Sequence, residues 1–224
     1  MFFEDEKDAL ERLYDLLPLN KLKDYIIITP SLKSIVFVDA LAKKLEIPYD
    51  FLFTEQIKAP NNDECQIAMI SETKELVYNE ALVKAFDISL DYIYGEANRT
   101  YEEKILKNVY RYRKGNLLKD LKGKNILMLH EGCESGITAS SCIKSLLKEE
   151  VSGIIYATAL MPSDVYDYIS VFADEVYCVQ KIDHFVDIEF YFKNKTILQA
   201  HEILDILEES RYYLPLKNKF ISEQ

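Results

Sequence analysis

Long hydrophobic runs are missing from this chain of 224 residues. No segment approaches the roughly 18 uninterrupted apolar residues that a membrane-spanning helix needs. The acidic start, Met1–Glu6, lacks the basic flank and the apolar core of a signal peptide. We therefore expect a cytoplasmic protein that has no membrane partner.

Basic stripes and paired cysteines are missing as well. The formal net charge is −11 and no basic face is evident, which argues against a nucleic-acid partner. An anionic small-molecule ligand would need a local positive pocket set against that overall charge. The four cysteines form no CxxC motif, so we expect reduced structural thiols. The three histidines are too scattered for a zinc site, and we predict no metal held by protein side chains alone.

Short apolar runs alternate with helical periodicity along the chain. Hydrophobic residues make up 49%, enough for an ordinary buried core. A predicted strand at 25–29 ends at Pro30, and a helix at 34–46 and a strand at 49–53 follow. This alternation is typical of an α/β fold with a parallel sheet, and we treat residues 1–224 as one domain. The other predicted elements are helices 4–17, 138–149, 163–172 and 196–209, and strands 125–129, 153–158 and 175–179.

The alternation pauses between residues 57 and 78. Ala59–Asp63 has the composition of a turn. Gln66–Ile70 and Leu76–Tyr78 are predicted to pair as the arms of a hairpin. Residues 79–113 have a largely helical composition that favours two helices. The segment 56–78 is therefore expected to form a hairpin or flexible loop beside the sheet.

The segment from Asn125 to Lys148 carries the main functional motif. An apolar strand runs into a turn that contains glycine, and the turn opens a helix. The first amide groups of a helix lack internal partners and its dipole adds partial positive charge, so a phosphate group fits there. Gly136 would permit close backbone approach, and Ser135 and Thr138 would add hydroxyl donors. In the alternative interpretation, Ser135 or Thr138 is a simple N-cap.

This segment resembles the motif by which type I phosphoribosyltransferases bind phosphoribosyl pyrophosphate (PRPP). That motif has apolar strand residues, two acidic residues, a short loop ending in Thr/Ser-Gly, and then Thr. The chain matches it at Glu131, Ser135-Gly136 and Thr138, and departs from it at His130, where the family usually has an acid. The resemblance covers almost the whole chain. It implies a central, mostly parallel sheet flanked by helices, with a small hood or hairpin.

The resemblance also implies roles for the loop residues. Glu131 would hold the ribose hydroxyl groups and would count among the catalytic residues. Glu134 stands where hypoxanthine-guanine enzymes have an aspartate that handles a proton on the base. A carboxylate beside a phosphate loop is alternatively just repulsive. The residues that would surround the 5′-phosphate are Gly132, Cys133, Glu134, Ser135, Gly136, Ile137 and Thr138.

The loop after the first strand resembles the Leu-Lys-Gly loop of the hypoxanthine-guanine enzymes. There the leucine–lysine peptide is cis and its amide contacts pyrophosphate. A cis bond between Leu32 and Lys33 is a hypothesis here, since such a bond costs about 3 kcal/mol and persists only where its surroundings enforce it. Ser31, Leu32, Lys33 and Ser34 would then bind the leaving group, with Lys33 as a catalytic residue. The alternative is a surface lysine in an ordinary turn between strand and helix.

Two further residues enter through the resemblance. Lys58 lies in a stretch similar to a mobile loop that covers the active site of many relatives, where it would meet pyrophosphate. A solvated loop lysine is the alternative. Phe185 belongs to a closing aromatic segment and would stack on a flat base. An aromatic residue at strand spacing is otherwise part of the core.

The implied reaction transfers phosphoribose from PRPP to a nitrogenous base and releases pyrophosphate, with Mg²⁺ neutralising the leaving group. The motif departs from the family at His130 and at Ser31-Leu32-Lys33, where a related bacterial group has Arg-Gly-Gly. A catalytically impaired sensor that binds PRPP or a nucleotide is therefore the alternative, and a structural role is a third. Because many relatives are dimers, a homodimer is also expected. The sequence does not indicate which base is accepted.

Overall fold

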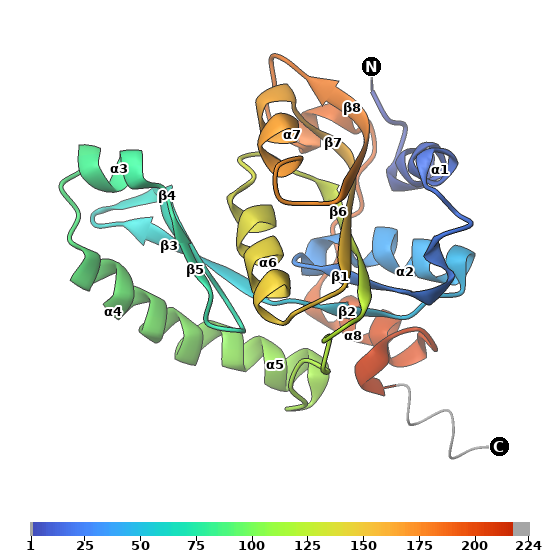
Figure 1. The fold of residues 1–224 in the computed structure, drawn as a ribbon, viewed down its shortest axis with the longest axis horizontal. Helices are drawn as coiled ribbons and strands as arrows, with labels where there is room; N and C mark the ends of the chain where they lie inside the picture. The colour runs from blue at the N-terminus through green and yellow to red at the C-terminus, as the bar shows by residue number, and fades with distance from the viewer. Residues whose placement is uncertain (1, 217–224) are drawn as a thin grey trace.

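A five-stranded parallel sheet forms the centre of the molecule (Figure 1). The computed structural model describes residues 2–216, so residue 1 and residues 217–224 of the predicted domain lie outside the described part. The strand order is β2-β1-β6-β7-β8. The strands are β1 (Tyr25–Thr29), β2 (Tyr49–Phe51), β6 (Asn125–Gly132), β7 (Gly153–Pro162) and β8 (Glu175–Ile182). The predicted α/β architecture with a central parallel sheet is confirmed.

Helices cover both faces of this sheet and bury two hydrophobic clusters against it. The helices that pack the first cluster against this sheet are α1 (Glu6–Leu16), α2 (Ile35–Leu45) and α8 (Ala200–Glu209), and the cluster continues into helices between residues 80 and 113. The helices of the second are α6 (Ile137–Lys148) and α7 (Ser163–Ile169). The layers explain why β6 is apolar from Ile126 to Leu129 and why β7 has few polar residues, because strands buried on both faces need no polar alternation.

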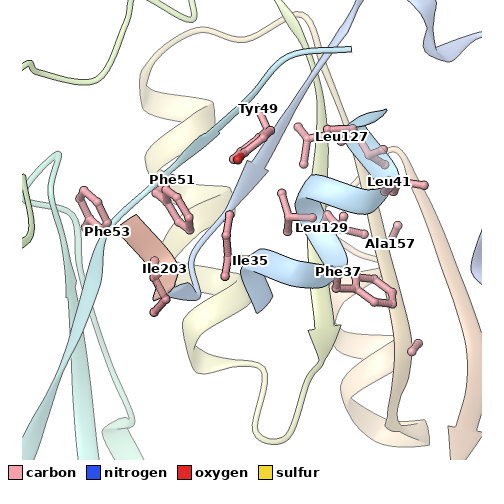
Figure 2. Packing of buried hydrophobic residues seen from close by; sticks show 14 of the residues in the cluster. Ile35, Phe37, Leu41, Tyr49, Phe51, Phe53, Leu127, Leu129, Ala157 and Ile203 are labelled. Atoms are coloured by element: carbon pink, nitrogen blue, oxygen red, sulfur yellow. The ribbon is translucent and has the colours of Figure 1, made fainter. Parts of the chain in front are cut away.

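Alternation along β6 divides its side chains between the two clusters. Leu127 and Leu129 belong to the first cluster, and Ile126 and Met128 belong to the second. Successive side chains of a strand point to opposite faces of the sheet, so each strand residue in turn supports one layer of helices. Figure 2 shows Leu127 and Leu129 beside the apolar residues of α2. The carboxyl end of β6 is thereby fixed from both sides.

A small antiparallel sheet and a chain of helices project from the central sheet and form the hood (Figure 1). Its elements are β3 (Thr54–Ala59), β4 (Asn62–Ser71), β5 (Leu76–Tyr78), α3 (Glu80–Ala85), α4 (Leu90–Thr100), a π-helical turn (Tyr101–Ile105) and α5 (Leu106–Arg113). The predicted hairpin between β4 and β5 is confirmed. The longer hairpin between β3 and β4 is additional, and Asn61 turns it with a left-handed φ of 59°.

A buried arginine joins the hood to the central sheet. The Arg113 side chain at the end of α5 is fully buried. Its Nε donates to Asp50 Oδ1 at 2.9 Å on β2, and its Nη1 donates to Glu72 Oε1 at 2.5 Å in the turn between β4 and β5. Nη2 donates to the carbonyl oxygen of Phe51. Because buried charges need both a counter-charge and hydrogen bonds, this cluster fixes the position of the hood.

Several elements end a few residues from their predicted limits, and for two of them the structure gives the cause. β7 continues beyond residue 158 to Pro162, because it keeps pairing with β8 as far as Ile182. The last helix begins at Ala200 rather than 196, because Gln199 and Glu202 form a capping box that sets its start. Among residues 2–216, no helix is long and apolar enough to cross a membrane.

Candidate ligand-binding site

A cleft of about 410 Å³ opens at the carboxyl ends of β1 and β6. Ligands of open α/β sheets commonly bind at this edge, where loops from neighbouring strands meet. The cleft is lined by the turn after β1, by the end of β6 and its loop to α6, by residues 187–195 after β8, and by Gln66 of β4. Of the residues that the sequence proposed, the lining includes Ser31, Lys33, Ser34, Glu131, Gly132, Cys133, Glu134, Ser135, Gly136 and Thr138.

The loop from β6 to α6 leaves the start of the helix open. Gly136 is the N-cap residue, with φ 72°, and no side chain caps the helix. The interpretation that Ser135 or Thr138 is a simple N-cap is therefore wrong. The early amide groups of α6 and its dipole face an edge of the cleft that Gly136, Ser135 and Thr138 line. This arrangement suits a phosphate group.

Gly136 is required at its position for two reasons. Its left-handed φ disfavours residues with a Cβ atom. A Cβ atom there would also lie 2.9 Å from Cγ1 of Val165 on α7. Gly132 is similarly confined, because a Cβ atom would lie 2.8 Å from the Ile188 side chain. The two glycines thus allow the loop to lie close to its neighbours on both sides.

The cysteine of the loop is structural. Cys133 is buried, and its N–H donates to the carbonyl oxygen of Leu160 at 3.0 Å. Burial raises the pKa of its thiol to about 11, so the thiol stays protonated near neutral pH. All four cysteines are free, as expected of reduced thiols.

Glu131 is the buried carboxylate of the cleft. Its side chain is 5% exposed, and its Oε2 lies 3.5 Å from Nζ of Lys195. Its Oε1 is buried without a hydrogen-bond partner. Burial raises the pKa of Glu131, and the attraction of Lys195 opposes that rise. Glu131 therefore presents an open acceptor to a ligand whenever it is ionised.

His130 stands beside Glu131 at the end of β6. Burial lowers the pKa of this histidine to about 4, and the positive charge of Lys195 adds to the effect. The imidazole is therefore uncharged near neutral pH. Its Nδ1 is buried and has no hydrogen-bond partner. It cannot supply the second negative charge of the family motif, but a neutral imidazole has one nitrogen that accepts a hydrogen bond.

The loop after β1 brings Lys33 into the cleft in a trans backbone. No peptide bond among residues 2–216 is cis, so the structure does not bear out the hypothesis of a cis bond between Leu32 and Lys33. The chain instead forms a 3-10 turn at Leu32–Ser34 that leads directly into α2. Leu32 lines a neighbouring pocket of about 450 Å³ beneath the hood, which Lys33 also reaches.

Several predicted residues lie elsewhere. Lys58 is on β3, where its carbonyl oxygen accepts a hydrogen bond from the Tyr92 hydroxyl at 3.2 Å, and it does not line the cleft. Phe185 packs against Tyr191 with ring centres 5.5 Å apart and also lies outside the cleft lining. Ile137 faces a separate pocket between α6 and α7.

Glu134 lies in the cleft but already has a partner. Its Oε1 accepts a hydrogen bond from the Ile188 N–H at 3.3 Å. The contact links the phosphate loop to the segment after β8. Glu134 therefore connects two walls of the cleft, and the proton transfer expected of it would have to occur from this hydrogen-bonded position.

Sequence reasoning missed the wall of the cleft that follows β8. Asp187, Ile188, Glu189 and Lys195 line it, and Gln66 joins them from β4. With Glu131 and Glu134, the cleft has four carboxylates against the ammonium groups of Lys33 and Lys195. No motif marks these residues, since the segment has neither helix nor strand periodicity. Acidic side chains therefore outnumber basic ones in the lining, so it does not form the local positive pocket expected for an anionic ligand. An anionic ligand there would depend on backbone amides and the two lysines.

Comparison with known proteins places the fold among solved structures. No protein-family model and no curated protein sequence matches the chain. The structure of TT1426 from Thermus thermophilus is similar with a TM-score of 0.76 and 20% identity, over 94% of this chain and 99% of that chain. This similarity shows that the two proteins share a fold.

Weaker similarities include several phosphoribosyltransferases. The purine phosphoribosyltransferase from Pyrococcus horikoshii has a TM-score of 0.46 and 14% identity, over 89% of this chain and 99% of that chain. The hypoxanthine phosphoribosyltransferase from Staphylococcus aureus has a TM-score of 0.46 and 14% identity, over 81% of this chain and 77% of that chain.

Proposed function

We propose that the cleft binds PRPP or a nucleoside 5′-monophosphate, with the 5′-phosphate at Gly132–Thr138. The observation that carries this proposal is the uncapped start of α6 at Gly136, which opens on the cleft. An uncapped helix start, with its free amide groups and dipole, is a natural site for a phosphate group. The motif resemblance adds the identity of the sugar phosphate.

The proposed reaction is phosphoribosyl transfer. A nitrogen of the base forms a bond to C1 of the ribose, the bond from C1 to the pyrophosphate oxygen breaks, and the base loses a proton. Lys33 would attract the anionic leaving group, Glu131 would accept from ribose hydroxyl groups, and Glu134 would receive the proton. Each of these side chains lines the cleft, which supports these roles, since a general base or binding group must lie within reach of the bound ligand.

Mg²⁺ would neutralise the pyrophosphate and favour its departure. Among residues 2–216 there is no group of three or more His, Cys, Asp or Glu side chains that could hold a metal ion. Mg²⁺ retains much of its water and commonly enters with substrate phosphates. The residues therefore fit an ion that arrives bound to pyrophosphate oxygens and water.

Binding without turnover is the second candidate function. The uncharged His130 favours it, because the family motif has a second carboxylate at this position and a neutral imidazole offers no negative charge to the ribose. A protein of this kind would sense PRPP or a nucleotide. A homodimer is part of the proposal for either function, and light scattering after size exclusion tests it.

Calorimetry with PRPP and Mg²⁺, followed by a pyrophosphate-release screen with purines, pyrimidines and small amines, separates the two functions. Binding with release supports transfer, and binding without release supports the sensor. Absence of binding at millimolar PRPP refutes both. Lys33→Met should weaken binding and slow any release. Lys23→Met is the matched control, because Lys23 is an exposed lysine that precedes the amino end of β1.

A further inference from the structure

Lys195 is held in the cleft by an ordered backbone. The N–H of Asn194 donates to the carbonyl oxygen of Glu4 at 3.0 Å, and the N–H of Thr196 donates to Glu6 Oε1 at 2.5 Å. These contacts tie the chain on both sides of Lys195 to the start of α1. The Lys195 side chain is 20% exposed, and its Nζ lies 5.5 Å from the centre of the Phe192 ring. Its ammonium group therefore has a defined position, unlike that of a surface lysine.

The surroundings of Glu131 make this position significant. Besides Lys195, the charged groups that act on the Glu131 carboxylate are Glu6 on α1 and Glu189 after β8, and both are negative. His130, its neighbour on β6, is uncharged near neutral pH. Burial and two like charges all favour the protonated form of Glu131. Lys195 is the cation that opposes them at ion-pair distance.

The two carboxylate oxygens of Glu131 have unequal surroundings, and the difference indicates which of them a ligand would contact. Oε2 faces Lys195, whereas Oε1 is buried and has no partner. A buried polar atom without a partner is costly and calls for an explanation, and a ligand that supplies the missing hydrogen bond is one. Glu131 lines the cleft, so a hydroxyl group of a bound ligand would satisfy Oε1. The uncharged His130 also lines the cleft, and its Nδ1 without a partner is a second acceptor in the tautomer that carries its proton on Nε2.

We propose that Lys195 is a positioning residue that keeps Glu131 charged in its buried site, so that Glu131 Oε1 accepts a hydrogen bond from a hydroxyl group of the ligand. A ligand with neighbouring hydroxyl groups, such as a ribose phosphate, fits a carboxylate and a neutral imidazole that both accept. The choice of ligand rests on the proposed function. The effect of Lys195 on the charge of Glu131 does not.

Titration of the ligand-free protein tests the charge directly. The carboxyl ¹³C signal of Glu131, assigned by its loss in Glu131→Gln, gives the midpoint of ionisation. Lys195→Met should raise that midpoint by at least about one pH unit, the usual effect of losing a nearby opposite charge. Lys195→Arg should keep it close to wild type. Lys193→Met is the matched control, because Lys193 pairs with Glu4 at 2.5 Å on the surface.

A second experiment measures the affinity for ribose 5-phosphate by calorimetry between pH 6 and pH 9. Lys195→Met should bind at least about tenfold more weakly at neutral pH and recover toward pH 9, where Glu131 ionises without help. A purely structural defect would not recover with pH. An unchanged Glu131 midpoint in Lys195→Met overturns the inference. If the midpoint moves but the wild type does not bind ribose 5-phosphate, the proposed function and the ligand hydroxyl contact fail, while the effect of Lys195 on Glu131 stands.

Discussion

Replacing Arg113 by methionine should detach the hood from the central sheet. The guanidinium group is fully buried and contacts Asp50, Glu72 and the carbonyl oxygen of Phe51. Methionine fills much of the same volume but leaves both carboxylates buried without a counter-charge. Removing one partner of a buried ion pair costs about 3 to 5 kcal/mol. We expect a loss of this size in the free energy of unfolding.

Urea denaturation at two pH values checks both the size and the cause of this effect. Burial raises the pKa of Asp50 to about 6 in spite of Arg113. The folded state therefore binds the Asp50 proton more tightly than the unfolded state does. The stability that this adds is complete below the unfolded pKa of about 3.9 and is lost as the pH rises through the folded pKa. Without the guanidinium group the pKa of Asp50 rises further. Arg113→Met should thus cost less stability at pH 5 than at pH 8.

The exposed Arg111 on the same helix supplies the control for this experiment. Arg111→Met should change the free energy of unfolding by less than about 0.5 kcal/mol, as is usual for an exposed side chain. A loss below about 1 kcal/mol for Arg113→Met, or a loss that does not depend on pH, would show that the buried cluster does not hold the hood in place.

Three further predictions concern the cleft. Gly136→Ala combines a left-handed φ with a Cβ atom 2.9 Å from Val165, so it should cost about 1 to 3 kcal/mol and weaken ribose 5-phosphate binding, whereas Gly95→Ala, with open space around it, should not destabilise the protein. Glu131→Gln should weaken PRPP binding about tenfold or more with little change in melting temperature; equal affinity removes Glu131 from the contact. Because the folded pKa of His130 is about 4, its contribution to stability is complete above about pH 6.5 and is lost as the pH falls, by about 2 kcal/mol at pH 5. His130→Asn should remove that part of the pH dependence in urea denaturation.

The elements of the central sheet could be predicted from local sequence alone. Tyr25–Thr29 and Asn125–Leu129 are continuous apolar runs, which strands buried on both faces produce. The start of α6 close to Gly136 was also predictable, because an apolar strand, a turn that contains glycine and a helical pattern follow one another directly in the sequence. These features depend on residues that are neighbours in the chain, so their physical signal is local.

The features that were missed depend on contacts between distant residues. β3 has mixed polar and apolar residues, and its pairing with β4 becomes favourable only when the hood folds. Lys195 reaches Glu131 because its backbone is tied to the start of α1. The resemblance placed Lys58 and Phe185 near a ligand, but the structure gives them contacts with Tyr92 and Tyr191 outside the cleft lining.

The central claim is that the start of α6 binds the phosphate of a ribose 5-phosphate ligand. Titration of ¹⁵N-labelled protein with ribose 5-phosphate, followed by amide chemical shifts, tests it most directly. The account predicts that the largest shifts occur at the amides of residues 134–139 and that Gly136→Ala reduces them. Saturating shifts centred elsewhere, or no shifts at millimolar ligand, would contradict the account.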